Sequence, residues 1–386
     1  MHRLFAALIL LAFLGLSACS RADAVRMAQV AVSRNPAAAA EAVARSKAVG
    51  YAVNPSALAG DVERFKEAVE KLQQAIERIW GDNAPTPTPK QYVKYTHNYL
   101  SRATVDFDTG VIEVVTLDQE EPIKSLENAI VTTLLAPSDP RAVDLYSDSE
   151  IKLGETPFLL GEVKDHEGKD IRWTWRAQRY ASHLTTNALD ASIIDGRKAK
   201  RVVFHMEKDH LDVRARKYRQ LVETAAVRFE VSRNLIYAVM KVESDFNPFA
   251  VSHAMAVGLM QVVPNTAGGD VYRYLNGRKG QPTPGDLKHP PTNVTYGTAY
   301  LHLLQTRLLR GIHDPVSREY CVIAGYNGGP GAVQRVFHPD SATARKRINA
   351  MPPAEVYATL KKRLPHSETR RYLDKVLAAK KRFVNF

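Results

Sequence analysis

The first regular hydrophobic pattern in the chain is helical and begins just after residue 60. Apolar residues recur at alternating spacings of four and three through residues 61–80, which is the period of an amphipathic α-helix. These positions are Val62, Phe65, Val69, Leu72, Ile76 and Ile79. Gly81-Asp82-Asn83 then favours an end to the helix. Because the repeat is short for a coiled coil, the sequence predicts a helix that packs on its own domain.

After this helix the hydrophobic period changes to two, which is typical of strands. Residues 103–117 predict two strands around the turn Asp108-Thr109-Gly110. Residues 159–163 and 171–175 predict a second hairpin, which contains two tryptophans. The remaining elements predicted in this part are a helix over residues 177–189 and a strand over residues 200–206. Residues 60–207 are therefore expected to form an α+β domain with a small antiparallel sheet.

From residue 211 onward the pattern is almost wholly helical. One apolar stripe consists of Tyr218, Leu221, Val222, Ala225 and Phe229. Further helices are predicted over residues 234–244, 294–308, 355–363 and 369–383. Asp314-Pro315 fits an N-cap followed by a first-turn proline, and it predicts a helix that runs to Tyr326. Residues 208–386 are expected to form an all-α domain.

The N-terminus has the pattern of a secretory signal. Residues 4–16 are an unbroken apolar run behind a short basic start. The run is shorter than the roughly 20 residues that span a bilayer. Residues 1–18 are therefore predicted to be a signal peptide that is removed on export.

The end of that run resembles a bacterial lipobox, Leu16-Ser17-Ala18-Cys19. The resemblance implies that Cys19 becomes the lipidated first residue, with several acyl chains that anchor it firmly. Ser20 rather than Asp follows, which by the same resemblance favours the outer membrane of a Gram-negative cell, facing the periplasm. Residues 19–59, rich in alanine and polar residues, are predicted to be a lipidated tether.

Composition and charge narrow the classes of partner. The chain is 45% hydrophobic and 24% charged, as expected for a globular protein, and its formal net charge is +12. Residues 361–386 hold nine Lys/Arg and two acidic residues. Export argues against nucleic acid as the partner of this basic patch and favours lipid headgroups or the carboxylate-rich cell wall. Cys321 has no cysteine partner after export and lies in an apolar run, so a buried free thiol is expected.

Glu243 lies in the last turn of the predicted helix 234–244, on the same face as Ile236 and Val239. An exposed carboxylate would be expected on the opposite face. The C-terminal end of a helix also disfavours an anion. Both effects raise the pKa of a carboxyl group, which suits a general acid near neutral pH. From position alone, a glutamate held by an arginine is an equal alternative.

Four short motifs favour the general acid over a glutamate held by an arginine. In chain order they are Glu243-Ser244, Gly258-Leu259-Met260-Gln261, Gly325-Tyr326-Asn327-Gly328 and Glu368-Thr369-Arg370-Arg371-Tyr372. Together they resemble the lytic murein transglycosylases with a goose-type lysozyme-like catalytic domain, family 23 of the glycoside hydrolases. The N-terminal part and the lipobox further resemble the membrane-bound lytic transglycosylase C branch of that family. The resemblance implies a lysozyme-like fold for the helical domain and peptidoglycan glycan strands as the substrate.

The chain departs from the family pattern at three positions. Met255 stands where the family often has glycine, so the geometry of that loop is expected to differ. Gly325 replaces the usual alanine before Tyr326, and Val263 replaces a methionine of some members. None of the three carries a transferable proton, so the departures leave the expected activity in place.

The resemblance implies that Glu243 acts first as acid and then as base on the bond between N-acetylmuramic acid and N-acetylglucosamine, with a 1,6-anhydromuramoyl product. The matching positions expected to bind substrate are Ser252, Met260, Gln261, Tyr326, Asn327, Glu368 and Tyr372. Loop capping is the alternative role for Ser252 and Gln261. Asp245 is a poor second carboxylate, because two residues along a helix is about 200° around it.

Two other functions stay open at this point. One is a hydrolytic muramidase with the same fold, and the other is a non-catalytic peptidoglycan-binding lipoprotein. No cofactor is expected, and His205 and His210 have the wrong spacing for a zinc-binding helix, so no metal is expected either. The α+β domain is expected to dock the enzyme or shape its groove, and complexes with other cell-wall enzymes are left open.

Overall fold

The structure is a computed structural model that describes residues 55–82 and 84–386. The predicted signal peptide, Cys19 and all but the last residues of the predicted tether lie outside these residues. Ala59–Phe386 forms one compact unit. The predicted domain boundary at residues 207 and 208 therefore stays a prediction. In the part of the chain that is described, no helix has both the length and the apolar character needed to cross a membrane.

A five-stranded antiparallel sheet organises the first part of the described chain, as the sequence predicted. The strands are β1 (Gln91–Thr96), β2 (Ser101–Asp106), β3 (Val111–Thr116), β4 (Leu189–Ile194) and β5 (Arg197–His205), in the order β1-β2-β3-β5-β4. The hairpin predicted around Asp108 is confirmed as β2–β3. Its turn is held by Asp106, whose carboxylate accepts the backbone N–H groups of Asp108 and Thr109.

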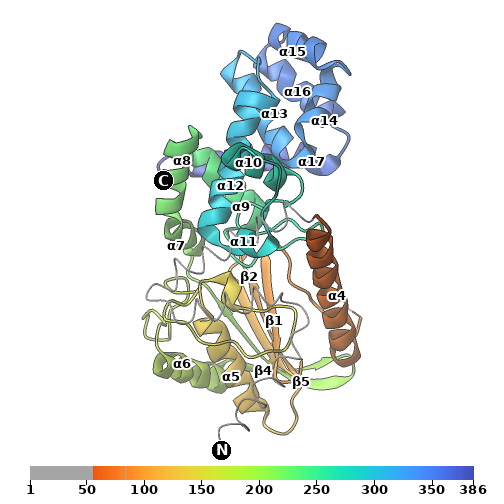
Figure 1. Cartoon of the computed structure of the whole chain (residues 1–386). Helices are drawn as coiled ribbons and strands as arrows, with labels where there is room; N and C mark the ends of the chain where they lie inside the picture. The colour runs from red at the N-terminus through yellow and green to blue at the C-terminus, as the bar shows by residue number, and fades with distance from the viewer. Residues whose placement is uncertain (1–54, 83) are drawn as a thin grey trace, which may run out of the picture. The chain divides into compact units, whose positions relative to one another are not determined.

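Helices cover both faces of this sheet (Figure 1). Helix α4 (Pro55–Trp80) buries Leu72, Ile76 and Trp80 against one face. Helices α5 (Pro122–Leu135) and α6 (Thr174–Asn187) pack on the opposite face. Successive residues of β1 point into different cores, Tyr92 into the α5–α6 side and Val93 into the α4 side. We call α4 to β5 (residues 55–205) the sheet region.

The second predicted hairpin is wrong. Thr174 begins α6, and the chain before it forms a turn in which the Asp165 carboxylate accepts the backbone N–H groups of Glu167 and Lys169. The two tryptophans that suggested strand alternation are exposed, Trp173 at 58% and Trp175 at 55%. The Trp175 ring lies 4.5 Å below the Arg176 guanidinium group, so cation–π stacking at the surface replaces burial in a sheet.

The rest of the chain, which we call the helical region (residues 210–386), contains eleven α-helices and one π-helical segment. They are α7 (His210–Lys217), α8 (Arg219–Phe229), α9 (Arg233–Ser244), α10 (Ala267–Asn276), α11 (Pro284–Lys288), α12 (Pro290–Leu303), η2 (Leu304–Leu308), α13 (Pro315–Gly328), α14 (Pro330–Phe337), α15 (Ser341–Ala350), α16 (Pro353–Arg363) and α17 (Ser367–Arg382). Every helix predicted in this part is present. Asp314 caps α13 as predicted, since its carboxylate accepts the N–H of Ser317 at 2.7 Å.

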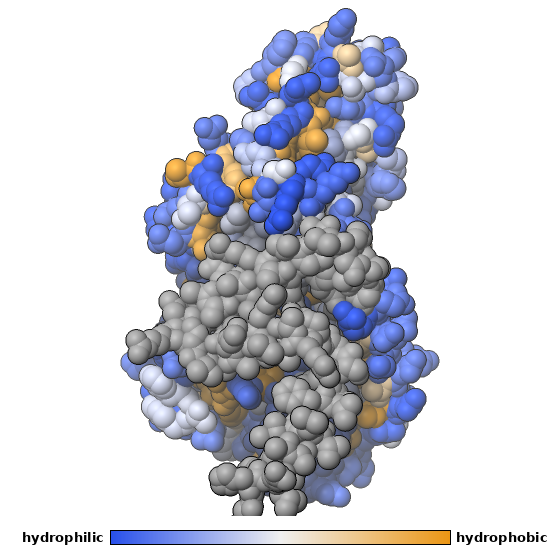
Figure 2. Space-filling view, viewed as in Figure 1, coloured by the Kyte–Doolittle hydropathy of each residue, from blue (hydrophilic) through white to orange (hydrophobic). Residues whose placement is uncertain are grey.

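A single apolar core underlies these helices, while their outer faces in the space-filling view are mostly hydrophilic (Figure 2). The core contains the buried residues of α9 and α13. Cys321 of α13 is fully buried, and burial raises the pKa of its thiol to about 12. The prediction of a buried free thiol is confirmed, and at neutral pH this thiol is not a nucleophile.

Candidate active site

Helix α9 carries Glu243 in its last turn, where the sequence placed it. Leu235, Ile236 and Val239 are buried in the core of the helical region. Glu243 itself is partly buried, because it follows the same face to the edge of that core. The helix ends at Asp245, whose backbone is left-handed with φ 51°. This sharp end leaves the Glu243 carboxyl at the margin of the apolar core.

The environment of Glu243 holds its carboxyl close to half-protonated at neutral pH. Burial is the largest effect and raises the pKa to about 7. The Tyr372 hydroxyl donates a hydrogen bond to Oε1 at 2.8 Å, which lowers the pKa and only partly offsets burial. The negative charge of Glu368 raises the pKa further, and the cation of Lys90 lowers it. The bonded partner is thus a tyrosine, not the arginine of the alternative interpretation.

Replacing Tyr372 by Phe is expected to raise the pKa of Glu243, because the hydrogen bond from the hydroxyl stabilises the carboxylate form. The measurement is an NMR titration of the Glu243 carboxyl carbon. Tyr357→Phe is the matched control, since that hydroxyl donates to the carboxylate of Asp374 elsewhere in the helical region. If the pKa of Glu243 fell or stayed unchanged in Tyr372→Phe, the bond would not stabilise the charged form.

The last two motifs come together beside Glu243. Tyr326 of α13 is close enough for the charge of Glu243 to help raise the pKa of its phenol, which burial raises most. The Tyr326 hydroxyl donates to the Met260 carbonyl at 2.8 Å. The Asn327 side-chain oxygen accepts a hydrogen bond from Thr369 of α17 at 2.7 Å. Segments that are far apart in the sequence therefore brace one another around the acid.

The Gly258–Gln261 turn is built on a glycine that no other residue could replace without strain. Gly258 has φ +75°, and a Cβ there would lie 2.3 Å from the Asn293 side-chain nitrogen. Asn293 is fully buried and accepts the N–H of Met260 at 2.8 Å. Gln261 donates to the Gly258 carbonyl at 2.9 Å, and its own side-chain oxygen is buried without a partner. This oxygen is therefore an unsatisfied polar atom inside the protein.

Ser252 and Met260 make contacts other than those first expected from the sequence, and their part in substrate binding stays a prediction. The Ser252 hydroxyl accepts the N–H of Ala256 at 3.0 Å, so it caps its own loop, which was the alternative role. Met260 was expected to line a sugar groove, but its side chain is fully buried. It packs so closely on α12 that a Cβ at Gly297 would lie 2.4 Å from its sulfur. Met260 contributes its carbonyl to the site rather than its side chain.

The loop before this turn holds a non-glycine residue, Met255, in a backbone conformation that glycine favours. Met255 adopts a left-handed backbone with φ 62° and is 8% exposed. Left-handed backbone costs a non-glycine residue roughly 1–2 kcal/mol. Burial of the methionine side chain offsets part of that cost. Met255 therefore adopts a backbone conformation that glycine favours, and the loop geometry expected to differ from that of the family stays a prediction.

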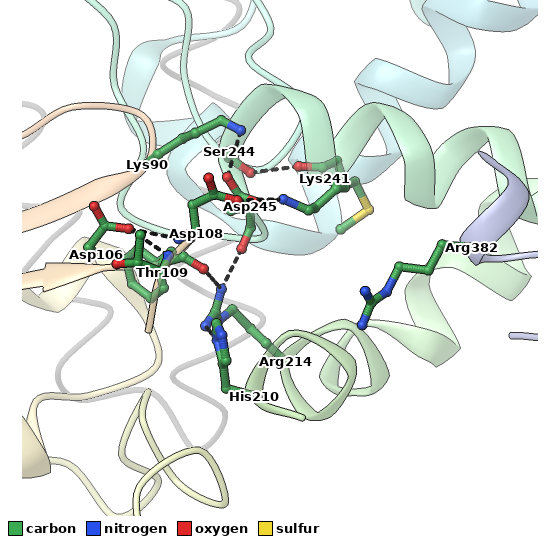
Figure 3. A network of polar contacts seen from close by, with 12 residues as sticks. Lys90, Asp106, Asp108, Thr109, His210, Arg214, Lys241, Ser244, Asp245 and Arg382 are labelled. Atoms are coloured by element: carbon green, nitrogen blue, oxygen red, sulfur yellow. Dashed lines mark hydrogen bonds and ion pairs between the residues drawn. The ribbon is translucent and has the colours of Figure 1, made fainter. Parts of the chain in front are cut away.

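The structure agrees with the sequence argument against Asp245 as a second carboxylate. Its side chain is fully buried and lies in a polar network with Lys90 and Lys241 (Figure 3). Lys90 lies 2.6 Å from its Oδ2, and Lys241 forms an ion pair with its Oδ1. Glu368, in contrast, is exposed in the first turn of α17. Of the two, Glu368 is the carboxylate whose charge acts on Glu243.

Sequence analysis missed two residues that contact parts of the site. Asn293 connects the Gly258–Gln261 turn to α12, and Lys90 lies just before β1 at the end of a proline-rich stretch. An asparagine within a helical pattern is a weak sequence signal of a role at the site, and the sequence around Lys90 gave no such signal. Across the described residues, no group of histidine, cysteine and carboxylate side chains could hold a metal ion. The chemistry that the site offers is proton transfer by a carboxyl group with a pKa near 7.

Family models and relatives match most of this chain. The family model "Membrane-bound lytic murein transglycosylase C, N-terminal domain" matches residues 58–217, and the "Transglycosylase SLT domain" matches residues 220–349. Membrane-bound lytic murein transglycosylase C of Yersinia pestis (strain Pestoides F) is 44% identical over 325 residues, which are 84% of this chain and 90% of the relative. The same values hold for the protein of that name from Yersinia pseudotuberculosis (serotype O:1b, strain IP 31758).

Among solved structures, the 70 kDa soluble lytic transglycosylase Slt70 from Escherichia coli is 26% identical, with a TM-score of 0.33. The match covers 44% of this chain and 24% of that one. The relatives from Yersinia span nearly the whole described chain, and both family models fall in the order of the two regions. The chain therefore belongs to the membrane-bound lytic murein transglycosylase C family.

Proposed function

We propose that this protein is a lytic transglycosylase that cleaves the β-1,4 bond between N-acetylmuramic acid and N-acetylglucosamine in peptidoglycan. The reaction leaves a 1,6-anhydromuramoyl end and consumes no water. The observation that carries the proposal is the Glu243 carboxyl, partly buried at the end of α9, with a pKa of about 7 and a tyrosine hydroxyl on Oε1. Membership of the family, together with the SLT domain, supports peptidoglycan as the substrate.

One carboxyl group suffices for both proton transfers. Protonated Glu243 donates its proton to the glycosidic oxygen as the bond to the anomeric carbon breaks, and N-acetylglucosamine leaves with a free hydroxyl. The Glu243 carboxylate then accepts the proton of the muramoyl C6 hydroxyl while that oxygen bonds to the anomeric carbon. The carboxyl is protonated again at the end. A pKa near ambient pH suits both steps.

The surrounding side chains have supporting roles in this proposal. Tyr372 steadies the carboxylate between the two steps through its hydrogen bond. Tyr326 places its phenol ring beside the reacting centre, and Asn327 braces the loop through Thr369. Gln261 holds the turn through its hydrogen bond to the Gly258 carbonyl, and its buried side-chain oxygen would have to become exposed before it could accept a hydrogen bond from a sugar. Ser252 acts on the loop rather than on the sugar.

The location follows the same family. The relatives are named membrane-bound, and the described residues contain no helix that could cross a membrane. A lipid on Cys19, after removal of residues 1–18, is the proposed anchor to the outer membrane, with residues 19–59 as the tether. The enzyme would then face peptidoglycan from the periplasmic side, with the predicted α+β domain (residues 60–207) before the predicted catalytic domain (residues 208–386).

A hydrolytic muramidase is the second candidate, and one observation favours it. The exposed carboxylate of Glu368 is close enough to raise the pKa of Glu243, so it could in principle activate a water molecule. That mechanism needs a second carboxylate near the anomeric carbon, whereas the transglycosylase needs none. The two reactions give products that differ by one water molecule.

Digestion of purified sacculi followed by mass spectrometry tests the proposal. The expected products are muramoyl ends that are lighter by one water molecule than those from a hydrolase, because the C6 oxygen replaces water as the nucleophile. Glu368→Gln is expected to leave the identity of the product unchanged. Reducing-end muramic acid as the main product would overturn the transglycosylase assignment in favour of the muramidase.

A further inference from the structure

The segment that follows Glu243 packs in the helical region through Phe246 and in the sheet region through Asn247 and Phe249. Phe249 packs in the core between the sheet and α5–α6, with ring centroids 5.2 Å from Tyr92 and 5.1 Å from Phe158. Asn247 is fully buried and donates to the Pro89 carbonyl at 3.0 Å. The chain therefore leaves the catalytic helix and enters the other core within six residues of Glu243.

The last residue before this crossing, Asp245, is held from both sides (Figure 3). Lys90 of the sheet region lies 2.6 Å from its Oδ2, and Lys241 of α9 pairs with its Oδ1. Lys241 also lies 2.9 Å from Asp108 in the β2–β3 turn. The Asp245 carbonyl accepts a 2.7 Å hydrogen bond from Arg214. The C-terminal end of α9 is thus held by charged groups of both regions: Lys90 and Asp108 belong to the sheet region, and Arg214 and Lys241 to the helical region.

We propose that Lys90 is a positioning residue of the active site, through which the sheet region holds Asp245, and with it Glu243, in the geometry that the reaction requires. The proposal rests on the proposed function, with Glu243 as the acid. It gives the sheet region a part in catalysis that docking or groove shaping would not require. Lys90 touches no substrate; it acts through Asp245.

The charge of Lys90 also acts on Glu243 directly. The charged or titratable groups around Glu243 are Tyr372 and Glu368 of α17, Tyr326 of α13 and Lys90 of the sheet region. Lys90 is the cation among them and lowers the pKa of Glu243, against burial and the charge of Glu368. Since Asp245 neutralises Lys90, the two residues are expected to move this pKa in opposite directions when each is changed.

Two variants make the test. Lys90→Met removes the cation while it keeps most of the side-chain length, and Lys90 is 37% exposed, so the fold is expected to survive. Asp245→Asn removes the opposing charge, and asparagine tolerates the left-handed backbone at this position. Lys124→Met is the matched control, because Lys124 pairs with Glu121 on the exposed side of α5. Lys90→Arg is the conservative variant.

The measurement is the pH dependence of kcat and KM for release of soluble fragments from sacculi by the full chain. Lys90→Met is expected to lower kcat by about 3- to 100-fold with little change in KM, as for a remote residue that positions the acid. In the plot of kcat against pH, the fall in rate at high pH should move to higher pH for Lys90→Met, because Glu243 stays protonated up to a higher pH. We call this fall the high-pH limb. Asp245→Asn should move the high-pH limb to lower pH. Lys90→Arg should restore both kcat and the position of the limb to their wild-type values.

Two results would overturn the proposal. One is a Lys90→Met enzyme that matches Lys124→Met in kcat and in the position of the limb. The other is a loss of rate with an unmoved limb, which is what lost stability alone would produce. Glu243→Gln separates this test from the proposed function: if that variant stays active, the function itself fails. If Glu243→Gln is inactive but the high-pH limb of Lys90→Met is not shifted, only the proposed role of Lys90 is rejected.

Discussion

Glu243→Gln is expected to lower the rate of glycan cleavage by about 10²–10⁴-fold, the range that general acid–base catalysis supplies. Glutamine keeps the size of the side chain and an oxygen that can accept the Tyr372 hydrogen bond. It cannot donate a proton to the glycosidic oxygen or remove one from the C6 hydroxyl. Both proposed steps fail together, so the loss is expected in kcat rather than in KM.

The same variant should not be less stable than the wild type at neutral pH. A folded-state pKa of about 7, above the ordinary value of 4.5, means that folding stability falls as pH rises between these two values. Glutamine removes this cost because it never ionises. The unfolding midpoint of Glu243→Gln is therefore expected to equal or exceed that of the wild type at pH 7 and above.

Glu319→Gln provides the matched control for activity. Glu319 is a partly buried carboxylate of α13 that pairs with Lys380, away from the site, and its loss should leave the rate close to that of the wild type. Retention of full activity by Glu243→Gln would reject both enzymatic interpretations of this site. The non-catalytic peptidoglycan-binding lipoprotein would then be the remaining function.

Arg214→Met is expected to have the largest effect on stability, because Arg214 joins three parts of the chain. Its side chain is 2% exposed and donates to the Glu162 carboxylate at 2.7 Å, the Phe107 carbonyl at 3.0 Å and the Asp245 carbonyl at 2.7 Å. Methionine would fill part of the space but leave the buried Glu162 carboxylate with one cation, Lys217.

The expected loss is about 3 kcal/mol or more, since removal of one partner from a buried ion pair costs roughly 3–5 kcal/mol. Lys217 remains as a partner and places the loss toward the lower end of that range. Urea unfolding of the full chain measures it. Arg141→Met is the control: Arg141 and Asp139 form an exposed pair, for which about 0–1 kcal/mol is expected. Equal losses in the two variants would contradict the structural role of Arg214.

The elements that sequence reasoning found are those with a clear local signal. Helix α4 shows a period of 3.6 because the side with Leu72 and Ile76 faces an apolar core, and the turn Asp108-Thr109-Gly110 indicates the β2–β3 hairpin. Strand β1 was missed because helices cover both faces of the sheet, so its residues 92–95 are all buried and no alternation remains. Lys94 in its middle is buried through hydrogen bonds to the carbonyl groups of Asp144 and Ser147, which no local pattern reveals.

The prediction of the second hairpin was wrong because alternation in the sequence was not matched by alternation in burial. Ile171, Trp173 and Trp175 alternate as strand residues do, but only Ile171 is buried. The two indole rings lie at the start of α6 and stack with arginines at the surface. A period of two over five residues carries too little information to exclude a turn followed by a helix.

For the site, the sequence by itself determined which residue is the candidate acid and why its pKa should be high. That information is local, since helix periodicity places Glu243 on an apolar face and the helix end disfavours its charge. Only the tertiary structure decided what surrounds it. The hydrogen-bonding partner Tyr372 is 129 residues away in the chain, and the cation Lys90 comes from the sheet region. Such contacts depend on how distant segments pack, and a pattern of neighbouring residues does not contain them.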